Sequence, residues 1–569
     1  MKFLSYLMLI CLILGSCSSE TTEQEDFTVN VRLSADPGRL NPIVGTPTTQ
    51  ATAINGLIFL PLAHYDPITF ELSPLLVKEV PEAIEGEDGS ITYEYEIVEE
   101  AVWDDGSPVT GEDYEFTLKA ALNPGVDAAA WRGILSDVRN VNVDEENPKK
   151  FSVTLDQYFH IAKEAFCTFE IVPSHVYDPT NALSSYEISD IKGAADTDST
   201  LSRFAEEFNS IKYTQEIVQG CGPYRLKAWE LDQYIVLEKK ENYWGEAYPD
   251  RTLLHNNPQE INYRIIADEN AAITLLKDGS IDLMLVADAT MFDNLKSSAN
   301  FEEKFNVETP SMSRFYYIGL NNRKPELSDK DVRRALAHLL DVDNIIQTLD
   351  NGYGNRLAGP IFPNSPVYEE SLKPIEYNPE KAIEILEQEG WKDSNGNGIR
   401  DKVIDGELVE LEVDYLASQS PLGQKVGLLF KDNAKEAGVE VTMEIKEGRA
   451  MQEAIFDHQY EASASAAGLS LAPYDPYQRW HSDNSPVRKG NIAGYVNERN
   501  DELIEIIRIS KDPKERTAAY KEFQKLLYEE QPVIFLYAPT QKFVISKKFD
   551  GLFSEKRPGY FVGSFELAD

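Results

Sequence analysis

The stretch from residue 408 to residue 446 constrains the fold more than any other part of the sequence. Its pattern predicts a strand over 408–415, a helix over 421–437 and a second strand over 439–445. Strands joined by such a crossover pair in parallel. A parallel sheet covered by helices is typical of α/β proteins, so the sequence predicts an α/β fold.

Length and composition indicate a large globular chain with more than one folded unit. It has 569 residues, of which 42% are hydrophobic and 26% charged, so it can build full cores. At roughly 100–200 residues per domain, this length predicts about two to four domains or lobes. Strand patterns are more frequent before about residue 265 than after it, which suggests at least two lobes that differ in their strand content.

Helix starts are predicted where a capping residue precedes an amphipathic stretch. Thr110 with Asp113 forms an acidic variant of the capping box, Ser328 precedes an apolar helix face, and Asn378 and Asp512 are each followed by proline. Gly390 is predicted to end the helix that begins after Asn378.

Charge and missing motifs exclude several classes of function. Lys and Arg number 54 against 96 Asp and Glu, and the net charge of −42 repels nucleic acid. The seven histidines form no HExxH pair, and the chain has no CxxC, GxSxG, Walker loop or GxGxxG. We therefore predict no catalytic residues, no enzymatic activity and no required cofactor.

The N-terminus indicates export and lipid attachment. Met1-Lys2 precedes an apolar run from Phe3 to Leu14, which is too short to span a bilayer and is typical of a signal peptide. The run ends in Leu14-Gly15-Ser16-Cys17, which resembles the bacterial lipobox, so Cys17 is predicted to carry the lipid. The alternative is an ordinary signal peptide with an incidental cysteine. The first interpretation predicts an exported protein that is anchored to a membrane and faces the periplasm or cell exterior.

Two cysteines remain for the folded part of the chain. Cys11 leaves with the signal peptide and Cys17 is lipidated, so Cys167 and Cys221 remain in an oxidising compartment. Either they pair as a disulfide or they are two buried free thiols, and spacing alone does not decide between these.

Six segments, in order from about residue 28 to about residue 550, resemble signatures of one protein family. They are the extracellular solute-binding proteins (family 5) of oligopeptide, dipeptide and nickel ABC importers. The segments are Trp103-Asp104-Asp105-Gly106-Ser107-Pro108-Val109-Thr110 with Glu112-Asp113; Gly220-Cys221-Gly222-Pro223-Tyr224 with Asn242-Tyr243-Trp244-Gly245; Gly279-Ser280-Ile281-Asp282; Asp331-Val332-Arg333-Arg334-Ala335-Leu336; Asn378-Pro379-Glu380-Lys381-Ala382 to Gly390-Trp391; and Tyr520 to Val533. Most of these motifs are expected to be structural, with Trp103 and Trp244 in the core.

The resemblance implies the two-lobed α/β fold of type II periplasmic binding proteins, with an extra subdomain in the first lobe and hinge strands between lobes. The implied boundaries are a signal peptide at 1–16, lipidated Cys17 and tether at 17–27, first-lobe segments at 28–57 and 166–267, the extra subdomain at 58–165, the second lobe at 268–532, and a C-terminal return to the first lobe at 533–569.

The ligand is expected in the cleft between the lobes, near two segments. The first is the loop after Asn41-Pro42, with Thr46, Thr48, Thr49 and Gln50 as candidates; the alternative there is a helix N-cap. The second resembles the family's G-x-x-x-D-x-x-DP segment, whose first Asp pairs with a peptide's ammonium group. Counted from Gly468, Ala472 occupies that position, so the usual ammonium anchor is missing. Candidates in this second segment are Leu469, Ser470, Leu471, Ala472, Tyr474, Asp475 and Trp480, and the alternative for Tyr474, Tyr477 and Trp480 is packing around the Asp-Pro turn.

A local pattern indicates calcium. Residues 393–401 follow D-x-N-x-N-G-x-x-D, which supplies oxygen ligands at alternate positions, with Asp393, Asn395, Asn397, Ile399 and Asp401 as candidates. Ile404 occupies the twelfth position where an EF-hand has Glu, although Asp405 is a possible replacement. The alternative is a surface turn held by Asx hydrogen bonds. Bound calcium would stabilise the loop locally.

The resemblance implies a monomeric receptor that closes on a small solute and delivers it to ABC permease subunits in the inner membrane, and a peptide is the expected ligand. Alternatives are a non-peptide solute receptor of the same family, a peptide-binding sensory or chaperone lipoprotein without a transport role, and, from another class, a surface hydrolase.

Overall fold

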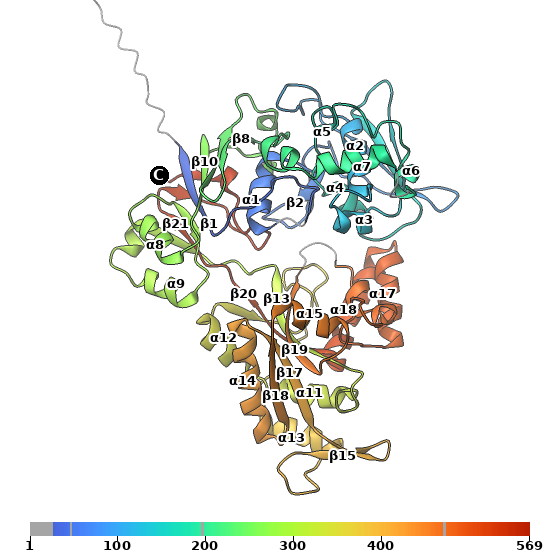
Figure 1. Ribbon diagram of the computed structural model, residues 1–569, viewed down its shortest axis with the longest axis vertical. Coiled ribbons are helices and arrows are strands. Elements are labelled where there is room, and N and C mark those ends of the chain that lie inside the picture. Colours follow the sequence, from blue (N-terminus) through green and yellow to red (C-terminus); the bar gives the residue numbers. More distant parts are fainter. Residues whose placement is uncertain (1–26, 46–47, 195–197, 470–473, 569) are drawn as a thin grey trace, which may run out of the picture.

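The computed structural model describes residues 27–45, 48–194, 198–469 and 474–568. Two lobes lie one above the other and are joined by a narrow waist (Figure 1). Each lobe is built on its own mixed sheet with helices packed against it. The predicted α/β class and two-lobed architecture are therefore confirmed. None of the helices in the described part of the chain combines the length and apolarity that a bilayer span requires.

The first lobe is organised by a sheet of seven strands within the described residues. β1 pairs in parallel with β10 and β11, and Val31 lies opposite Tyr263 and Leu283. The remaining pairs are antiparallel. Val29 and Val31 point into the core, as the alternating pattern of this strand requires. In order across the sheet the strands are β12 (Phe305–Glu308), β21 (Phe543–Ser546), β11 (Leu283–Leu285), β1 (Thr28–Leu33), β10 (Glu260–Ile265), β9 (Tyr234–Lys239) and β8 (Tyr224–Glu230).

The second lobe contains the predicted β-α-β unit. β17 and β18 pair in parallel and α14 connects them. The predicted first strand is divided, because residues 407–410 leave the sheet and form a hairpin with β15. In order across this sheet the strands are β14 (Gly354–Arg356), β20 (Val533–Pro539), β13 (Arg314–Leu320), β19 (Ala462–Gly468), β17 (Glu412–Ser418) and β18 (Glu440–Lys446); the hairpin is β15 (Asp401–Ile404) with β16 (Glu407–Glu410).

Strand pairing corrects two of the predicted lobe boundaries. β11 and β12 pair with β21 in the first sheet, so the second lobe begins near residue 310 and not at 268. β20 pairs with β13 in the second sheet, so the chain returns to the first lobe after Pro539 and not at 533. Both errors have one cause: strand pairing between distant segments decides which sheet a segment joins.

A smaller sheet forms the centre of the predicted extra subdomain. Its strands are β4 (Ile84–Glu85), β5 (Ile91–Glu96), β7 (Lys150–Leu155) and β6 (Val138–Val143), all antiparallel. Two-stranded sheets elsewhere in the first lobe are β2 (Ala63–Tyr65) with β3 (Leu72–Pro74) and β22 (Phe549–Asp550) with β23 (Glu566–Leu567).

Helices cover the sheets of both lobes (Figure 1). Asn378 and Asp512 cap helices as predicted, Thr110 forms a capping box with Asp113, and Asp329 rather than Ser328 caps α11. The first-lobe helices are α1 (Thr49–Ile58), α2 (Gly111–Leu122), α3 (Ala129–Ile134), α4 (Ala162–Cys167), α5 (Ser174–Tyr177), α6 (Ile188–Lys192), α7 (Ser199–Phe208), α8 (Glu269–Lys277), α9 (Ala289–Lys296) and α10 (Phe301–Lys304). Those of the second lobe are α11 (Lys330–His338), α12 (Val342–Asp350), α13 (Pro379–Gln388), α14 (Pro421–Glu436), α15 (Gly448–Phe456), α16 (Tyr477–Trp480), α17 (Glu498–Ile509) and α18 (Pro513–Glu530).

Asp113 explains the motif that begins at Trp103. Its carboxylate accepts hydrogen bonds from Trp103 Nε1 at 3.1 Å, from the backbone N–H of Thr110 at 3.0 Å, and from the N–H and Oγ of Ser174 at 2.9 and 2.8 Å. One buried carboxylate thus joins the motif loop, the start of α2 and the start of α5. The motif is structural, and Trp103 and Trp244 are both buried as predicted.

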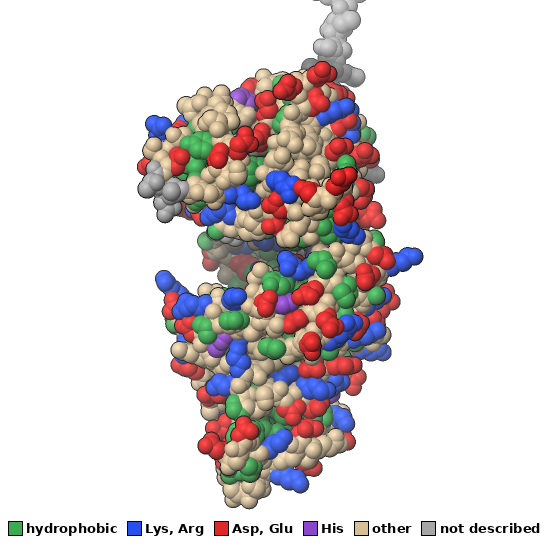
Figure 2. All heavy atoms as spheres, turned by 90° about the vertical axis from the view of Figure 1, so that its right-hand side faces the viewer, with side chains coloured by type: hydrophobic (Ala, Val, Ile, Leu, Met, Phe, Trp, Pro, Cys, Tyr) green, Lys and Arg blue, Asp and Glu red, His purple; other side chains and the backbone are tan. Residues whose placement is uncertain are grey.

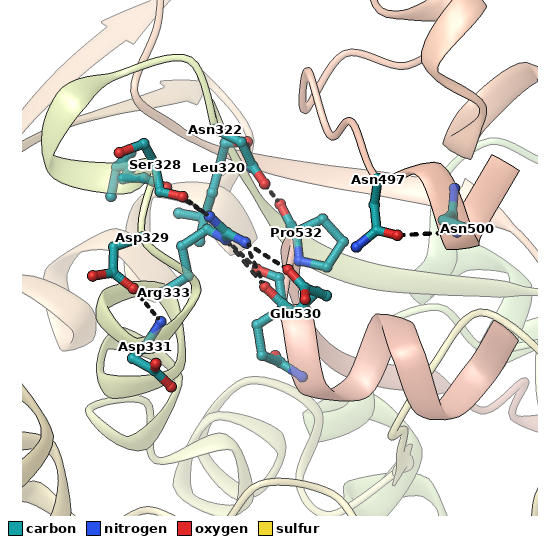
Figure 3. A network of polar contacts seen from close by, with 12 residues as sticks. Leu320, Asn322, Ser328, Asp329, Asp331, Arg333, Asn497, Asn500, Glu530 and Pro532 are labelled. Atoms are coloured by element: carbon teal, nitrogen blue, oxygen red, sulfur yellow. Dashed lines mark hydrogen bonds and ion pairs between the residues drawn. The ribbon is translucent and has the colours of Figure 1, made fainter. Parts of the chain in front are cut away.

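Arg333 gives the Val-Arg-Arg-Ala-Leu motif its structural role (Figure 3). From α11, its guanidinium donates to the carbonyl oxygens of Glu530 and Gln531 at the end of α18. It also donates to the carbonyl oxygens of Leu327 and Ser328 at 2.9 and 2.8 Å. A cation suits these groups because a helix ends in unpaired carbonyls and a partial negative charge.

Cys167 and Cys221 are separate buried thiols, so the disulfide alternative is wrong. Each sulfur has a different environment: Cys167 donates to Tyr95 Oη at 3.8 Å, and the backbone of Cys221 accepts from Trp244 Nε1. Burial raises the pKa of both thiols to about 12, which keeps them protonated and unreactive.

Candidate functional site

Two antiparallel segments connect the lobes and form a hinge. The backbone N–H of Gln541 donates to the carbonyl oxygen of Pro310 at 2.8 Å, and that of Met312 donates to Pro539 at 2.8 Å. The lobes face each other across a hollow (Figure 2). Rotation about so narrow a connection changes the width of the hollow without disturbing either sheet.

A cavity of about 280 Å³ lies on the first-lobe side of the hinge, where β1, β10 and β11 end. In open parallel sheets, ligands bind beyond these carboxyl ends. Arg32, at the end of β1, donates to the carbonyl oxygens of Ile266, Ala267 and Leu285 at 2.9–3.1 Å. The guanidinium therefore ties the three strand ends together and shapes the cavity floor.

The start of α1 supplies part of the cavity wall. Thr48 is the N-cap, and its Oγ1 accepts from the N–H of Ala51 at 3.0 Å, so the N-cap alternative holds for this residue. Thr49 and Gln50 line the cavity. Thr49 Oγ1 accepts from Arg557 at 3.2 Å, and the Gln50 amide donates to Ser34 Oγ at 3.1 Å. Thr46 lies outside the described residues.

The second predicted segment is largely structural where it is described. Trp480 is only 1% exposed, and its Nε1 donates to Tyr474 Oη at 2.8 Å. Asp475 pairs with Arg508 at 3.3 Å and accepts from the N–H of Tyr477. Leu469 is buried in the same core as Trp480, and neither residue lines the cavity beside the hinge. Ser470, Leu471 and Ala472 lie outside the described residues.

The extra subdomain contacts the second lobe directly through His160. Its backbone N–H donates to Arg508 at 2.9 Å, and its Nε2 lies 2.9 Å from Tyr520 Oη. The Tyr520 hydroxyl donates in turn to the carbonyl oxygen of Tyr474. This chain of contacts, here called the latch, joins the first lobe to the segment that resembles the family's ligand loop. Burial lowers the pKa of His160 to about 4, so the imidazole is neutral at pH 7.

A second cavity, of about 70 Å³, lies between α1, β2 and the C-terminal segment 556–564. Its wall includes Lys556, Glu170 and His64, and it shares Ala53, Pro558 and Tyr560 with the larger cavity. No sequence motif marked these residues, because they come from three distant segments. The only signal was compositional: a lysine and an arginine stand next to each other near the end of a strongly acidic chain.

The predicted calcium loop is held by its own hydrogen bonds. Asp393 accepts from the N–H groups of Gly396 and Gly398, and Asp401 accepts from the N–H and hydroxyl of Ser394. These are the Asx contacts of the alternative interpretation. Within the described ranges, no group of three or more His, Cys, Asp or Glu side chains is arranged to hold a metal ion.

Comparison with known proteins covers most of the chain. A family model described as bacterial extracellular solute-binding proteins, family 5, matches residues 71–489. The oligopeptide-binding protein AppA of Bacillus subtilis (strain 168) is 26% identical, over 100% of this chain and 98% of its own length. The solved structure of that protein with a nonapeptide aligns with a TM-score of 0.65 at 24% identity, covering 95% of this chain and 99% of that one. HbpA2 of Haemophilus parasuis aligns with a TM-score of 0.75 at 16% identity, covering 95% and 100% of the two chains.

Proposed function

The chain belongs to the bacterial extracellular solute-binding proteins of family 5, and we propose on this basis that it is the substrate-binding component of an ABC importer, capturing a peptide or peptide-like solute between its lobes. Members of this family bind solutes outside the cell for ABC importers and are not enzymes. The full-length similarity to an oligopeptide-binding protein supports a peptide ligand.

The position of the 280 Å³ cavity carries the proposal. It lies beside the hinge, and Gln541, which belongs to the hinge, also lines it. A solute bound there contacts the first lobe, and closure brings the second lobe over it, excluding water from the polar contacts. Thr49, Gln50 and the backbone groups of the strand ends offer hydrogen bonds, which suits a ligand rich in amide groups.

Mass spectrometry of solutes released from the denatured, purified protein tests this function first. Peptides in the extract would support the proposal, and a single non-peptide solute would move the protein to another branch of the family. Calorimetry with the identified ligand then compares two variants. Gln50→Leu removes a cavity-lining amide, and its affinity should fall about ten-fold, close to the worth of one hydrogen bond. Gln452→Leu changes an exposed glutamine on α15 and should leave affinity unchanged.

Lipid attachment at Cys17 and delivery to a permease complete the proposal. The lipobox pattern supports the anchor. Cells producing the protein should incorporate labelled palmitate into it, and Cys17→Ser should release it from the membrane fraction. Uptake of the identified solute should fall in cells that lack the protein. Unchanged uptake would favour a sensory or chaperone receptor.

The calcium site at 393–401 stays a prediction of the sequence pattern. Millimolar calcium should raise the melting temperature of the protein, and Asp393→Asn should abolish that rise, because Asp393 is the first oxygen ligand of the pattern. If calcium has no effect, the loop is an Asx-stabilised turn.

A further inference from the structure

Lys556 is a buried lysine without a hydrogen-bond acceptor among the described residues. It is 8% exposed, and its Nζ lies 5.5 Å from the centroid of the Phe561 ring. Both residues line the 70 Å³ cavity. A buried ammonium needs an acceptor or a counter-ion, because leaving it desolvated and unpaired is costly. Burial lowers the pKa of Lys556 to about 7, because the charged form of the side chain is poorly solvated in this environment.

The acidic groups nearby do not supply a full counter-charge. Glu170 lines the same cavity, but burial raises its pKa to about 7, so near neutral pH much of it is protonated. Asp66 contributes the larger of the two attractions on Lys556, but its own oxygens already accept from the N–H groups of Ile68 and Thr69 and from Thr252 Oγ1.

His64 and Arg557 add hydrogen-bond donors to the cavity wall. His64 Nδ1 accepts from the backbone N–H of Tyr65 at 2.9 Å, and burial keeps the pKa of this ring low, so the neutral imidazole carries its hydrogen on Nε2. Arg557 also lines the cavity, and its pKa is lowered by burial and by the charge of Arg314 in the second lobe. Hydrogen-bond donors and basic side chains are therefore concentrated around this cavity, although the chain as a whole has a net charge of −42.

Size limits what the cavity can hold. A volume of about 70 Å³ accommodates a few waters or one small polar group, but not a peptide. The two cavities are adjacent, because Ala53, Pro558 and Tyr560 line both.

We propose that the cavity at Lys556 binds a carboxylate group of the ligand, with Lys556 as its counter-ion and His64 as a further donor. This inference rests on the proposed function and specifies the ligand: it carries a free carboxylate, either the C-terminus of a peptide or that of a small organic acid. A carboxylate fits because it brings the negative charge and the acceptor atoms that the buried ammonium of Lys556 lacks.

Two matched peptide libraries test the proposal on the purified, ligand-free protein. One contains randomised tri- to hexapeptides with a free C-terminal carboxylate, and the other has the same sequences as C-terminal amides. Bound peptides are quantified by mass spectrometry. The free acids should be enriched at least ten-fold over the amides, and Lys556→Met should reduce this ratio to below two-fold. Lys547→Met removes an exposed lysine of the same C-terminal region and should leave the ratio unchanged.

Acetate and succinate, titrated in parallel by calorimetry, distinguish the two carboxylate sources. Lys556-dependent binding of these acids with no peptide binding would support the carboxylate site and refute the peptide function. Equal binding of peptide acids and amides, without Lys556-dependent binding of the small acids, would overturn the inference and leave the peptide function intact. Binding of none of these probes would overturn both. If Lys556→Met does not fold, the wild-type acid-to-amide ratio and Lys556→Arg, which keeps the charge, still decide the question.

Discussion

Replacing Lys556 by methionine should stabilise the ligand-free protein at neutral pH, and the gain should vanish in alkali. The comparison is made in a Glu170→Gln background, because Glu170 has its own pKa of about 7 and would otherwise titrate in the same range. Methionine keeps a long unbranched side chain in the cavity wall while removing the charge.

The magnitude follows from the lowered pKa. Burial moves the pKa of Lys556 from 10.5 to about 7. Between these values the unfolded chain holds a proton that the folded chain lacks, so the free energy of unfolding of the lysine protein rises with pH. At about 1.4 kcal/mol per pKa unit, the lysine costs about 4 kcal/mol at pH 7 and less than about 1 kcal/mol at pH 10. The negative charge of Glu170 raises the pKa of Lys556, so the Glu170→Gln background lowers that pKa further. The pH range over which the free energy of unfolding rises with pH then extends to lower pH, and the direction of the change stays the same.

Urea unfolding at pH 7, 8.5 and 10 measures this difference. Trp103, Trp131, Trp229 and Trp244 belong to or pack against the first-lobe core, so tryptophan fluorescence reports unfolding of the lobe that holds Lys556. The advantage of the methionine variant should shrink by about 3 kcal/mol between pH 7 and pH 10. Lys547→Met in the same background should show no such trend. An advantage that stays constant or grows with pH would refute the reasoning, because it would mean that burial does not lower the pKa of Lys556.

Three further substitutions test other parts of the structure. Tyr520→Phe removes the hydroxyl that connects His160 to Tyr474 in the latch. Ligand affinity measured by calorimetry should fall about five-fold, which corresponds to roughly 1 kcal/mol. Tyr528→Phe, on the same helix, is the control. Arg333→Met leaves four carbonyl groups without their donor and should lower the free energy of unfolding in urea by about 3 kcal/mol, whereas Arg334→Met should change it by less than about 1 kcal/mol. In Asp113→Asn, one side-chain oxygen remains to accept the hydrogen bonds that two oxygens accept from Trp103, Thr110 and Ser174. The substitution should lower the melting temperature without changing ligand affinity. An unchanged melting temperature would contradict the structural role given to this motif.

Features set by neighbouring residues were predicted well. The β-α-β unit at 408–446 follows from periodicity, and the caps at Asn378 and Asp512 follow from the hydrogen-bonding capacity of one side chain next to a proline. The motifs around Trp103 and Trp244 were expected to be structural, and the buried contacts of Asp113 and Arg333 now give two of the family motifs a physical reason.

The candidate site was predicted only in part. Thr49 and Gln50 line the cavity beside the hinge, but Trp480 and Leu469 are core residues, because an aromatic or apolar side chain near an Asp-Pro turn packs inward as readily as toward a ligand. Lobe boundaries failed for a related reason. β11 joins its sheet by pairing with β1, and β20 joins its sheet by pairing with β13; in each case the partner strand is more than 200 residues away in the sequence.

By itself, the sequence determined most of the helices and strands, the α/β class and the family, because periodicity, capping and ordered motifs depend on residues close together in the chain. Only the tertiary structure decided where the lobes divide, that the two cysteines stay apart, and that His64, Glu170 and Lys556 enclose one cavity. These features depend on contacts between segments that are far apart in the sequence. Burial then decides the charge of Lys556, because the pKa of a side chain is set by the solvent and charges that surround it in space.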